Sequence, residues 1–171
     1  MKVLITGARG QLGRHLESVI NNMGNYEVIS LGHAELDITD PAQVHQQIVS
    51  SVPDVVIHTA ANTNVDGCEL DPENAYRVNA LGSRNIAAAA AKTGAKMVYI
   101  STDYVFDGKS RRPYTEFDPA NPINVYGRSK LAGELYVSNL LNKYFIVRTS
   151  WLYGKYGTNF VKTMLRMAGE K

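Results

Sequence analysis

The chain has 171 residues, of which 44% are hydrophobic and 20% charged, and its formal net charge is only +2 at pH 7. This length fits one domain that buries roughly 70% of its unfolded surface. Because no run of Lys and Arg exceeds two residues, neither a nucleic acid nor a membrane is expected as a partner. No apolar run approaches the ~20 residues that span a bilayer, and the single cysteine, Cys68, excludes an internal disulfide, so we expect a cytoplasmic protein.

Short apolar stretches alternate with helical patterns along the chain. Strands are predicted at residues 3–6, 27–31, 55–59, 97–101 and 145–148. Helices are predicted near residues 11–22, 41–51, 72–93, 125–141 and 157–169. Two of these helices begin at Asp-Pro pairs, Asp40-Pro41 and Asp71-Pro72, which suit an N-cap followed by the first turn. The alternation predicts an α/β fold built on a doubly wound parallel sheet.

A glycine-rich turn follows the first strand at once. Gly7, Gly10 and Gly13 are spaced Gly-x-x-Gly-x-x-Gly, one residue wider at the first step than the usual dinucleotide fingerprint. Glycines let the backbone turn tightly and approach a pyrophosphate, which free N–H groups at the helix start then bind. An ordinary strand-to-helix turn has the same pattern, but the flanking strand and helix favour the dinucleotide site.

Two later segments carry side chains suited to the reduction of a carbonyl. Tyr126 and Lys130 are four residues apart on an expected helix, so both lie on one face. A cation beside a phenol lowers its pKa from about 10 by favouring the phenolate. The residues Ser101-Thr102-Asp103 end the fourth strand and add hydroxyl groups. Because parallel strands share one carboxyl edge, we expect these groups to meet the glycine turn in a single crevice.

Four segments, in this order, resemble the extended short-chain dehydrogenase/reductase family, whose cofactor half is Rossmann-like: residues 60–66, 101–106, 124–134 and 148–154. The resemblance covers essentially the whole chain. It is strongest with the branch that reduces the 4-keto group of dTDP-4-dehydro-L-rhamnose or a related nucleotide sugar. Members of that branch continue well beyond this length, so we expect residues 1–171 to be an NAD(P)-binding domain that lacks most of the substrate lobe.

The resemblance implies specific roles. Tyr126 is the proton donor, Lys130 supports it and binds the nicotinamide ribose, and Thr102 orients the carbonyl, with Ser101 as the close alternative. The substrate is expected to contact Thr102, Asp103 and Trp151. The cofactor is expected to contact Tyr126, Lys130, Gly7, Gly10, Gln11, Leu12, Gly13, Asp37, Ile38, Ala61, Asn62 and Thr63. Trp151 also suits a core position, and Asp37 also suits a turn or cap. The four histidines are scattered, so no metal site is expected.

The cofactor is expected to be NADPH, with NADH also accepted. NAD-specific sites commonly carry Asp or Glu after the second strand, whereas residues 30–33 read Ser-Leu-Gly-His here. Without that carboxylate a 2′-phosphate is not repelled, and Arg9 or His33 can attract it. Arg9 is equally explained as a solvated turn residue.

Other functions remain open. Sugar 4,6-dehydratases usually carry Thr-Asp-Glu after the fourth strand, but this chain has Tyr104 in place of the glutamate, so the acid for elimination is missing. A nucleotide-sugar epimerase shares Tyr126 and Lys130. A non-catalytic regulatory subunit similar to the methionine adenosyltransferase β subunit also fits the resemblance, and a homodimer is left open.

Overall fold

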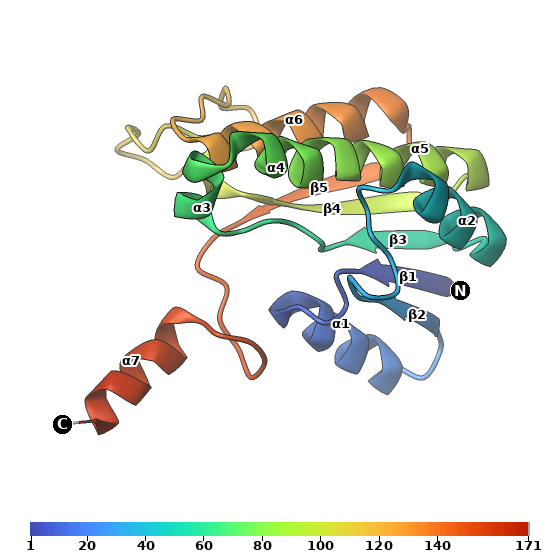
Figure 1. The fold of residues 1–171 in the computed structure, drawn as a ribbon, viewed down its shortest axis with the longest axis horizontal. Coiled ribbons are helices and arrows are strands. Elements are labelled where there is room, and N and C mark those ends of the chain that lie inside the picture. The colour runs from blue at the N-terminus through green and yellow to red at the C-terminus, as the bar shows by residue number, and fades with distance from the viewer. Residues whose placement is uncertain (171) are drawn as a thin grey trace.

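Residues 1–170, which the computed structural model describes, form one parallel sheet with the strand order β2-β1-β3-β4-β5 (Figure 1). The strands are β1 (Lys2–Thr6), β2 (Glu27–Leu31), β3 (Val55–His58), β4 (Lys96–Thr102) and β5 (Tyr144–Thr149). Each neighbouring pair runs parallel. The expected doubly wound α/β fold is therefore confirmed, and all five strands end at the same edge of the sheet.

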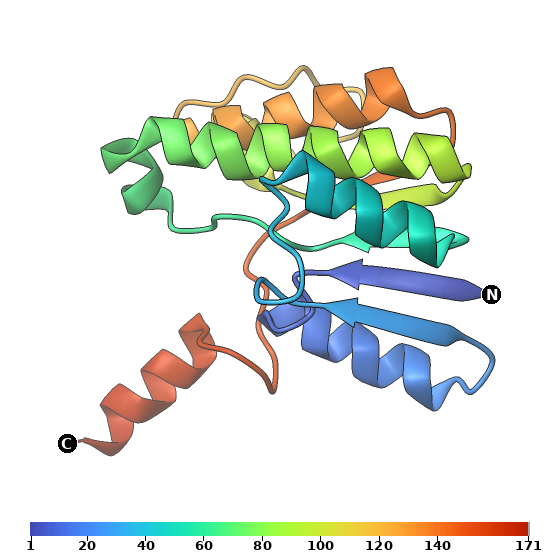
Figure 2. The same cartoon turned by 45° about the vertical axis from the view of Figure 1, so that its right-hand side comes forward.

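Helices cover both faces of this sheet. One face is covered by α2 (Pro41–Ser51), α5 (Ser83–Thr93) and α6 (Val125–Leu140), whereas α1 (Gln11–Asn22) lies on the opposite face (Figures 1 and 2). The expected caps are present: the Asp40 side chain accepts hydrogen bonds from Ala42 N and Gln43 N, and Asp71 accepts one from Asn74 N. None of the helices within residues 1–170 is long and apolar enough to cross a membrane.

The single helix expected over residues 72–93 is wrong in detail. It consists of α4 (Pro72–Tyr76), a π-helical segment η1 (Arg77–Gly82) and α5. In η1 the carbonyl of Asn79 accepts a hydrogen bond from the Ser83 hydroxyl at 2.7 Å, and Gly82 lies against Ile38 where a Cβ would be only 2.7 Å from Ile38 Cδ1. Such π segments inside helices are frequent at functional sites.

Three further elements differ from expectation. A short helix, α3 (Val65–Leu70), and a 3₁₀ turn, η2 (Asp103–Val105), follow β3 and β4 where no element was predicted. The last helix, α7 (Phe160–Gly169), begins three residues later than expected, because the Asn159 side chain caps it by accepting from Lys162 N. Sequence periodicity misses α3 and η2, because each spans fewer than two helical turns.

The main core lies between the sheet and the helices α2, α5 and α6. The alanines of α5 let that helix pack closely, and Ala87, Ala89 and Ala90 are buried there with Leu4, Val56 and Met97. Towards the other end of the chain, large apolar side chains are exposed: Phe145 on β5 is 64% exposed, Trp151 in the segment after β5 is 74% exposed, and Leu165 on α7 is 68% exposed. Figures 1 and 2 show α7 standing away from the sheet at the end of a long connecting segment.

Candidate active site

The glycine turn after β1 forms a tight backbone cradle. Gly7 adopts the left-handed region at φ +67°, and a Cβ on it would lie 2.6 Å from Ala60 N. A Cβ on Gly13 would lie 2.5 Å from the carbonyl oxygen of Gly7. Only glycine fits at these two positions, so α1 begins directly against the turn with its free N–H groups pointing to the carboxyl edge of the sheet.

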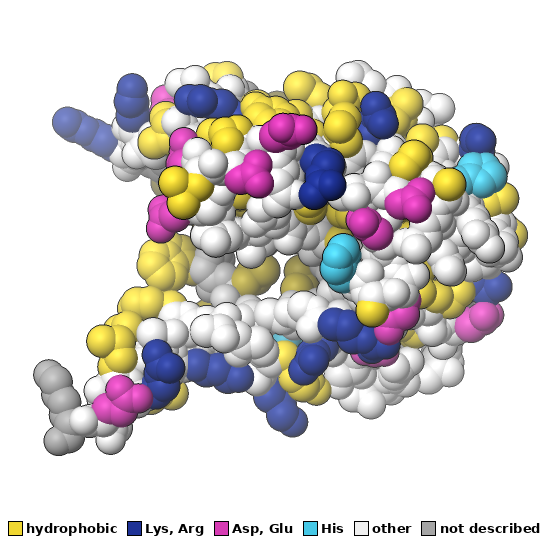
Figure 3. Space-filling view, in the orientation of Figure 1, with side chains coloured by type: hydrophobic (Ala, Val, Ile, Leu, Met, Phe, Trp, Pro, Cys, Tyr) yellow, Lys and Arg dark blue, Asp and Glu magenta, His cyan; other side chains and the backbone are white. Residues whose placement is uncertain are grey.

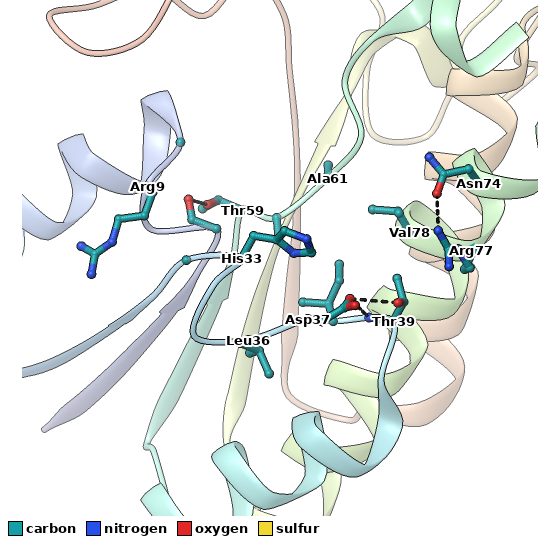
Figure 4. Close-up of a pocket in the computed structure, with 15 residues that line it drawn as sticks. Arg9, His33, Leu36, Asp37, Thr39, Thr59, Ala61, Asn74, Arg77 and Val78 are labelled. Carbon is teal, nitrogen blue, oxygen red and sulfur yellow. Dashed lines mark hydrogen bonds between the residues drawn. The ribbon is translucent and has the colours of Figure 1, made fainter. Parts of the chain in front are cut away.

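A first cavity of ≈ 490 Å³ opens beside this turn, between the ends of β1, β2 and the π segment (Figure 4). Its lining includes the predicted cofactor residues Gly7, Gly10, Asp37, Ile38 and Ala61, together with Arg9, Gly32, His33, Asn74 and Arg77. The volume and the mixed polar and apolar lining suit an adenosine group.

A second cavity of ≈ 430 Å³ continues from the first, since Gly10, Thr59 and Ala61 line both. The predicted residues on it are Gln11, Leu12, Gly13, Thr63, Thr102, Asp103, Tyr126, Lys130 and Trp151. Figure 3 shows the molecular surface deeply hollowed between the main body and the chain that leads to α7. One continuous cleft therefore joins the glycine cradle to the predicted chemical groups, and its residues fit a dinucleotide.

Tyr126 lies on the first turn of α6, which Asn124 caps by accepting from Gly127 N at 2.7 Å. Burial raises the pKa of the Tyr126 phenol, and a hydrogen bond with the Thr102 hydroxyl opposes that rise. The expectation that a neighbouring cation leaves this pKa below its ordinary value is therefore wrong in this structure. Desolvation of the phenolate outweighs the favourable contacts.

Lys130 is 2% exposed and lies one turn after Tyr126 on the same face of α6. Its Nζ donates a hydrogen bond to the carbonyl oxygen of Ile100 at 2.7 Å and lies 4.1 Å from the centre of the Tyr99 ring. Burial lowers the pKa of Lys130 to about 7, although the Glu134 carboxylate opposes this. The predicted i, i+4 pair is thus real, with an ammonium that titrates near neutrality.

Ser101 and Thr102 differ in their hydrogen-bond partners. The Ser101 hydroxyl donates to Glu134 Oε1 at 2.5 Å, and Glu134 also binds Arg148 at 2.6 Å. The Thr102 hydroxyl instead interacts with Tyr126 and donates to Asp103 Oδ1 at 3.0 Å. Ser101 therefore ties β4 to α6 and β5, and Thr102 is the hydroxyl that accompanies the phenol.

For Trp151 and Asp37, the contacts of the side chain bear on the alternative structural roles that the sequence allowed. Trp151 is exposed, lines the second cavity and packs edge-on against Phe160 at 5.4 Å between ring centroids, so the alternative of a core position is wrong. Asp37 lines the first cavity and also forms a turn, since its Oδ1 accepts from the amide and hydroxyl of Thr39 at 2.9 and 2.8 Å. These bonds from Thr39 lower the pKa of Asp37.

Asn62 is the predicted cofactor residue that lies outside both cavity linings. Its backbone N–H and C=O are both held by the Asn79 side chain, at 2.8 and 3.0 Å. Asn79, which is fully buried in η1, also donates to the Ser129 hydroxyl on α6 at 3.0 Å. Sequence reasoning missed Asn79, because a polar residue in a predicted regular helix does not indicate that the helix becomes π-helical at that point. The Asn79 side chain thus holds the loop of residues 60–64 next to α6, the helix that carries Tyr126 and Lys130.

The end of β2 corrects a second expectation. Residues 30–33 contain no acid, but the Glu35 carboxylate turns back and accepts a hydrogen bond from Gly32 N at 2.8 Å. The same carboxylate pairs with Arg9 at 3.1 Å. A carboxylate therefore does stand at the end of the second strand. It was missed because it belongs to a residue three positions further along the chain.

Comparison with known proteins agrees with this geometry. A family model described as RmlD substrate binding domain matches residues 1–171. The dTDP-4-dehydrorhamnose reductase of Aggregatibacter actinomycetemcomitans is 48% identical over 167 residues, which cover 98% of this chain and 57% of that protein. The solved dTDP-4-dehydrorhamnose reductase of Bacillus anthracis in complex with NADP superposes with a TM-score of 0.97 at 52% identity, over 99% of this chain and 60% of that one.

The solved structure of the orthologue from Clostridium acetobutylicum gives a TM-score of 0.96 at 50% identity, again over 99% of this chain and 60% of the other. The chain thus spans about 60% of the length of these relatives. Fold and sequence agree in placing the matched part at the N-terminal cofactor side, where the two joined cavities lie.

Proposed function

Because this chain belongs to the dTDP-4-dehydrorhamnose reductase (RmlD) family, we propose that it serves in the NADPH-dependent reduction of dTDP-4-dehydro-L-rhamnose to dTDP-L-rhamnose, a precursor of cell-surface polysaccharide. One observation carries the proposal. Thr102, Tyr126 and Lys130 line the same cavity as the glycine cradle of residues 10–13. A hydroxyl, a phenol and an ammonium that face one dinucleotide-sized cleft are the groups that reduction of a carbonyl requires.

The cofactor would be held by the cradle at Gly7, Gly10 and Gly13, by Asp37 and Ile38 at its adenosine end, and by Lys130 at its nicotinamide end. When bound, NADPH supplies the hydride that the carbonyl carbon accepts. The glycine positions exclude side chains, so the backbone amides can reach a pyrophosphate.

Tyr126 donates its phenolic proton to the sugar 4-oxygen as the carbonyl is reduced. Burial raises the pKa of this phenol above its ordinary value of about 10, so the phenol carries its proton at neutral pH, as an unperturbed tyrosine also does. A proton donor needs that state. The Thr102 hydroxyl holds the carbonyl oxygen in line with that phenol and stabilises the negative charge that develops on it. After the transfer, the Lys130 ammonium stabilises the phenolate until a proton returns from solvent.

The nucleotide sugar would lie over the exposed end of the second cavity. Trp151 offers a flat apolar face there, and Asp103 offers a carboxylate beside Thr102. Both are positions at which the sugar ring or its hydroxyls can be held while the 4-oxygen faces Tyr126.

The proposal is tested by following NADPH oxidation with dTDP-4-dehydro-L-rhamnose while the native mass is recorded. A reductase consumes one NADPH for each sugar that is reduced. An epimerase would interconvert sugars without net consumption of cofactor, and a regulatory subunit would co-purify with a large partner and turn over no keto-sugar. Either of the last two outcomes overturns the reductase assignment.

A further inference from the structure

Arg9, which lines the first cavity, forms a charged pair with Glu35. Arg9 comes from the glycine turn and Glu35 from the loop after β2, and Arg9 Nη2 lies 3.1 Å from Glu35 Oε1. The other carboxylate oxygen of Glu35 accepts from Gly32 N at 2.8 Å. The acid is therefore anchored to the backbone at the end of β2, while the guanidinium is the movable partner, with 54% of its side chain exposed.

The end of β2 is chemically the place where the two nicotinamide cofactors differ. In doubly wound folds an acid there binds the 2′-hydroxyl of the adenine-side ribose, whereas an arginine there accommodates a 2′-phosphate. This chain carries both groups, and they bind each other. Figure 4 shows the Arg9 side chain extending away from His33 and Asp37, so the arginine is turned out of the cavity centre.

We propose that Glu35 sets the cofactor preference of this site by competing with a 2′-phosphate for Arg9. NADPH must draw Arg9 from Glu35 and bring its phosphate near that carboxylate, whereas NADH finds a carboxylate that can accept from its ribose hydroxyl. The site accordingly accepts both dinucleotides and separates them weakly. This inference takes only one assumption from the proposed function, namely that the cofactor is a nicotinamide dinucleotide.

Two other charged residues that line the first cavity, Asp37 and Arg77, are hydrogen-bonded to neighbouring side chains. Asp37 is bound by Thr39, and Arg77 Nη2 donates to the Asn74 side chain at 2.8 Å. Glu17 is a weaker partner of Arg9, at 3.9 Å from Nη1. The hydrogen bond from Arg9 is also the main cause of the lowered pKa of Glu35.

The experiment measures the dissociation constants of NADPH and NADH for the 171-residue chain by calorimetry, with no sugar present. Glu35→Gln keeps an acceptor for Gly32 N–H and removes the charge that holds Arg9. It should raise the preference for NADPH over NADH by about threefold to tenfold. Arg9→Gln should lower that preference by a similar factor. Glu27→Gln removes the same charge at the opposite end of β2 and should leave the preference unchanged.

The two variants combined test whether Glu35 acts through Arg9. In the Arg9→Gln background, Glu35→Gln should lose more than half of its effect on the preference. The inference is overturned if Glu35→Gln leaves the ratio of the two constants as it is, or changes it equally with and without Arg9. If the chain binds neither dinucleotide, the proposed cofactor is also wrong. If the chain binds both dinucleotides tightly but Glu35→Gln does not change the ratio of their dissociation constants, only this inference is refuted and the proposed function stands.

Discussion

The ammonium of Lys130 donates a hydrogen bond to the backbone carbonyl of Ile100 across 2.7 Å, and this bond ties α6 to β4 at the carboxyl edge of the sheet. Thr102 lies two residues further along that strand, and Tyr126 lies one turn earlier on that helix. Together with the bond from the Ser101 hydroxyl to Glu134, the Lys130 bond sets the distance between the helix that carries the phenol and the strand that carries the hydroxyl.

Tyr126→Phe, made in a protein that shows turnover, should lower the turnover by about 10²- to 10⁴-fold, because a positioned proton donor is lost. NADPH binding should stay nearly intact, since the ring still fills the same space. Tyr136→Phe removes a phenol from the same helix almost three turns away and serves as the control. Stopped assays of sugar reduction together with a cofactor titration separate the two effects. Undiminished reduction by the Tyr126→Phe protein would show that Tyr126 is not the donor.

Lys130→Met should weaken cofactor binding and raise the pH at which turnover peaks, because the phenolate loses its neighbouring cation. A cofactor titration and a pH–rate profile measure the two effects. Lys92→Met, which removes an exposed cation from α5, should change neither. If the cofactor affinity and the pH–rate profile of Lys130→Met both match those of the unmodified protein, Lys130 neither binds the cofactor nor supports the Tyr126 phenolate.

The same substitution should also change how stability depends on pH. The pKa of Lys130 is about 7 in the folded chain, below its ordinary value of about 10.4 in an unfolded one. Between these values the unfolded state binds more protons, so the free energy of unfolding contributed by Lys130 rises as the pH rises from about 7 to 10. Urea denaturation at several pH values should therefore give a flatter slope for Lys130→Met than for the unmodified chain. Parallel curves would contradict the buried ammonium.

His58 changes stability in the same direction as Lys130, but at lower pH. It is buried between the Thr6 hydroxyl at 2.6 Å and the Ser83 hydroxyl at 3.1 Å, and burial lowers its pKa from 6.5 to about 3. Its stabilising contribution is complete above about pH 6.5 and is lost as the pH falls towards 3.

His58→Leu should cost about 1–3 kcal/mol at pH 7.5, because the Thr6 hydroxyl loses its imidazole partner and the Ser83 hydroxyl keeps only its bond to the Asn79 carbonyl. The cost should shrink at pH 5, where the unmodified protein has already lost part of the contribution. Urea unfolding at both pH values measures this, with the exposed His45→Leu as control. A cost that is equal at both pH values would contradict the neutral buried imidazole.

Asn79→Ala should destabilise the fold by about 2 kcal/mol, because the backbone N–H and C=O of Asn62 lose their partner. NADPH binding should also weaken, since the 60–64 loop that borders both cavities is released. The exposed Asn139→Ala on α6 is the matched control. Calorimetric titration of a variant that remains folded distinguishes the two effects, and wild-type affinity would show that the loop needs no such clamp.

The 171-residue chain should bind NADPH but reduce the sugar poorly. Every predicted cofactor residue lies within residues 7–130, whereas only Thr102, Asp103 and Trp151, which all line the second cavity, are predicted to contact the sugar. Reactions that depend on positioning lose rate steeply when the reacting atoms are loosely held. Calorimetry with NADPH and with the dTDP-sugar tests this. Fast reduction of the keto-sugar by the monomeric chain would refute it.

Local sequence patterns were sufficient for the framework of this protein. Alternating apolar stretches located all five strands to within two residues, because a buried parallel strand must be nearly all apolar. The glycine spacing predicted the cradle, since Gly7 and Gly13 stand where a Cβ would meet backbone atoms. The spacing of Tyr126 and Lys130 placed both on one face of α6, which follows from helical geometry alone.

Only the tertiary structure decided the electrostatics of the site. The pKa of Lys130 depends on its removal from water beneath β4, and the state of Arg9 depends on a carboxylate that returns from Glu35 to the end of β2. Asn79 lies in the π segment, from which its side chain accepts a hydrogen bond from the backbone N–H of Asn62. Each of these features arises between groups that are distant in the chain or depends on burial by several elements. A local pattern carries no record of either, because desolvation and ion pairing are properties of the packed neighbourhood and not of the residue.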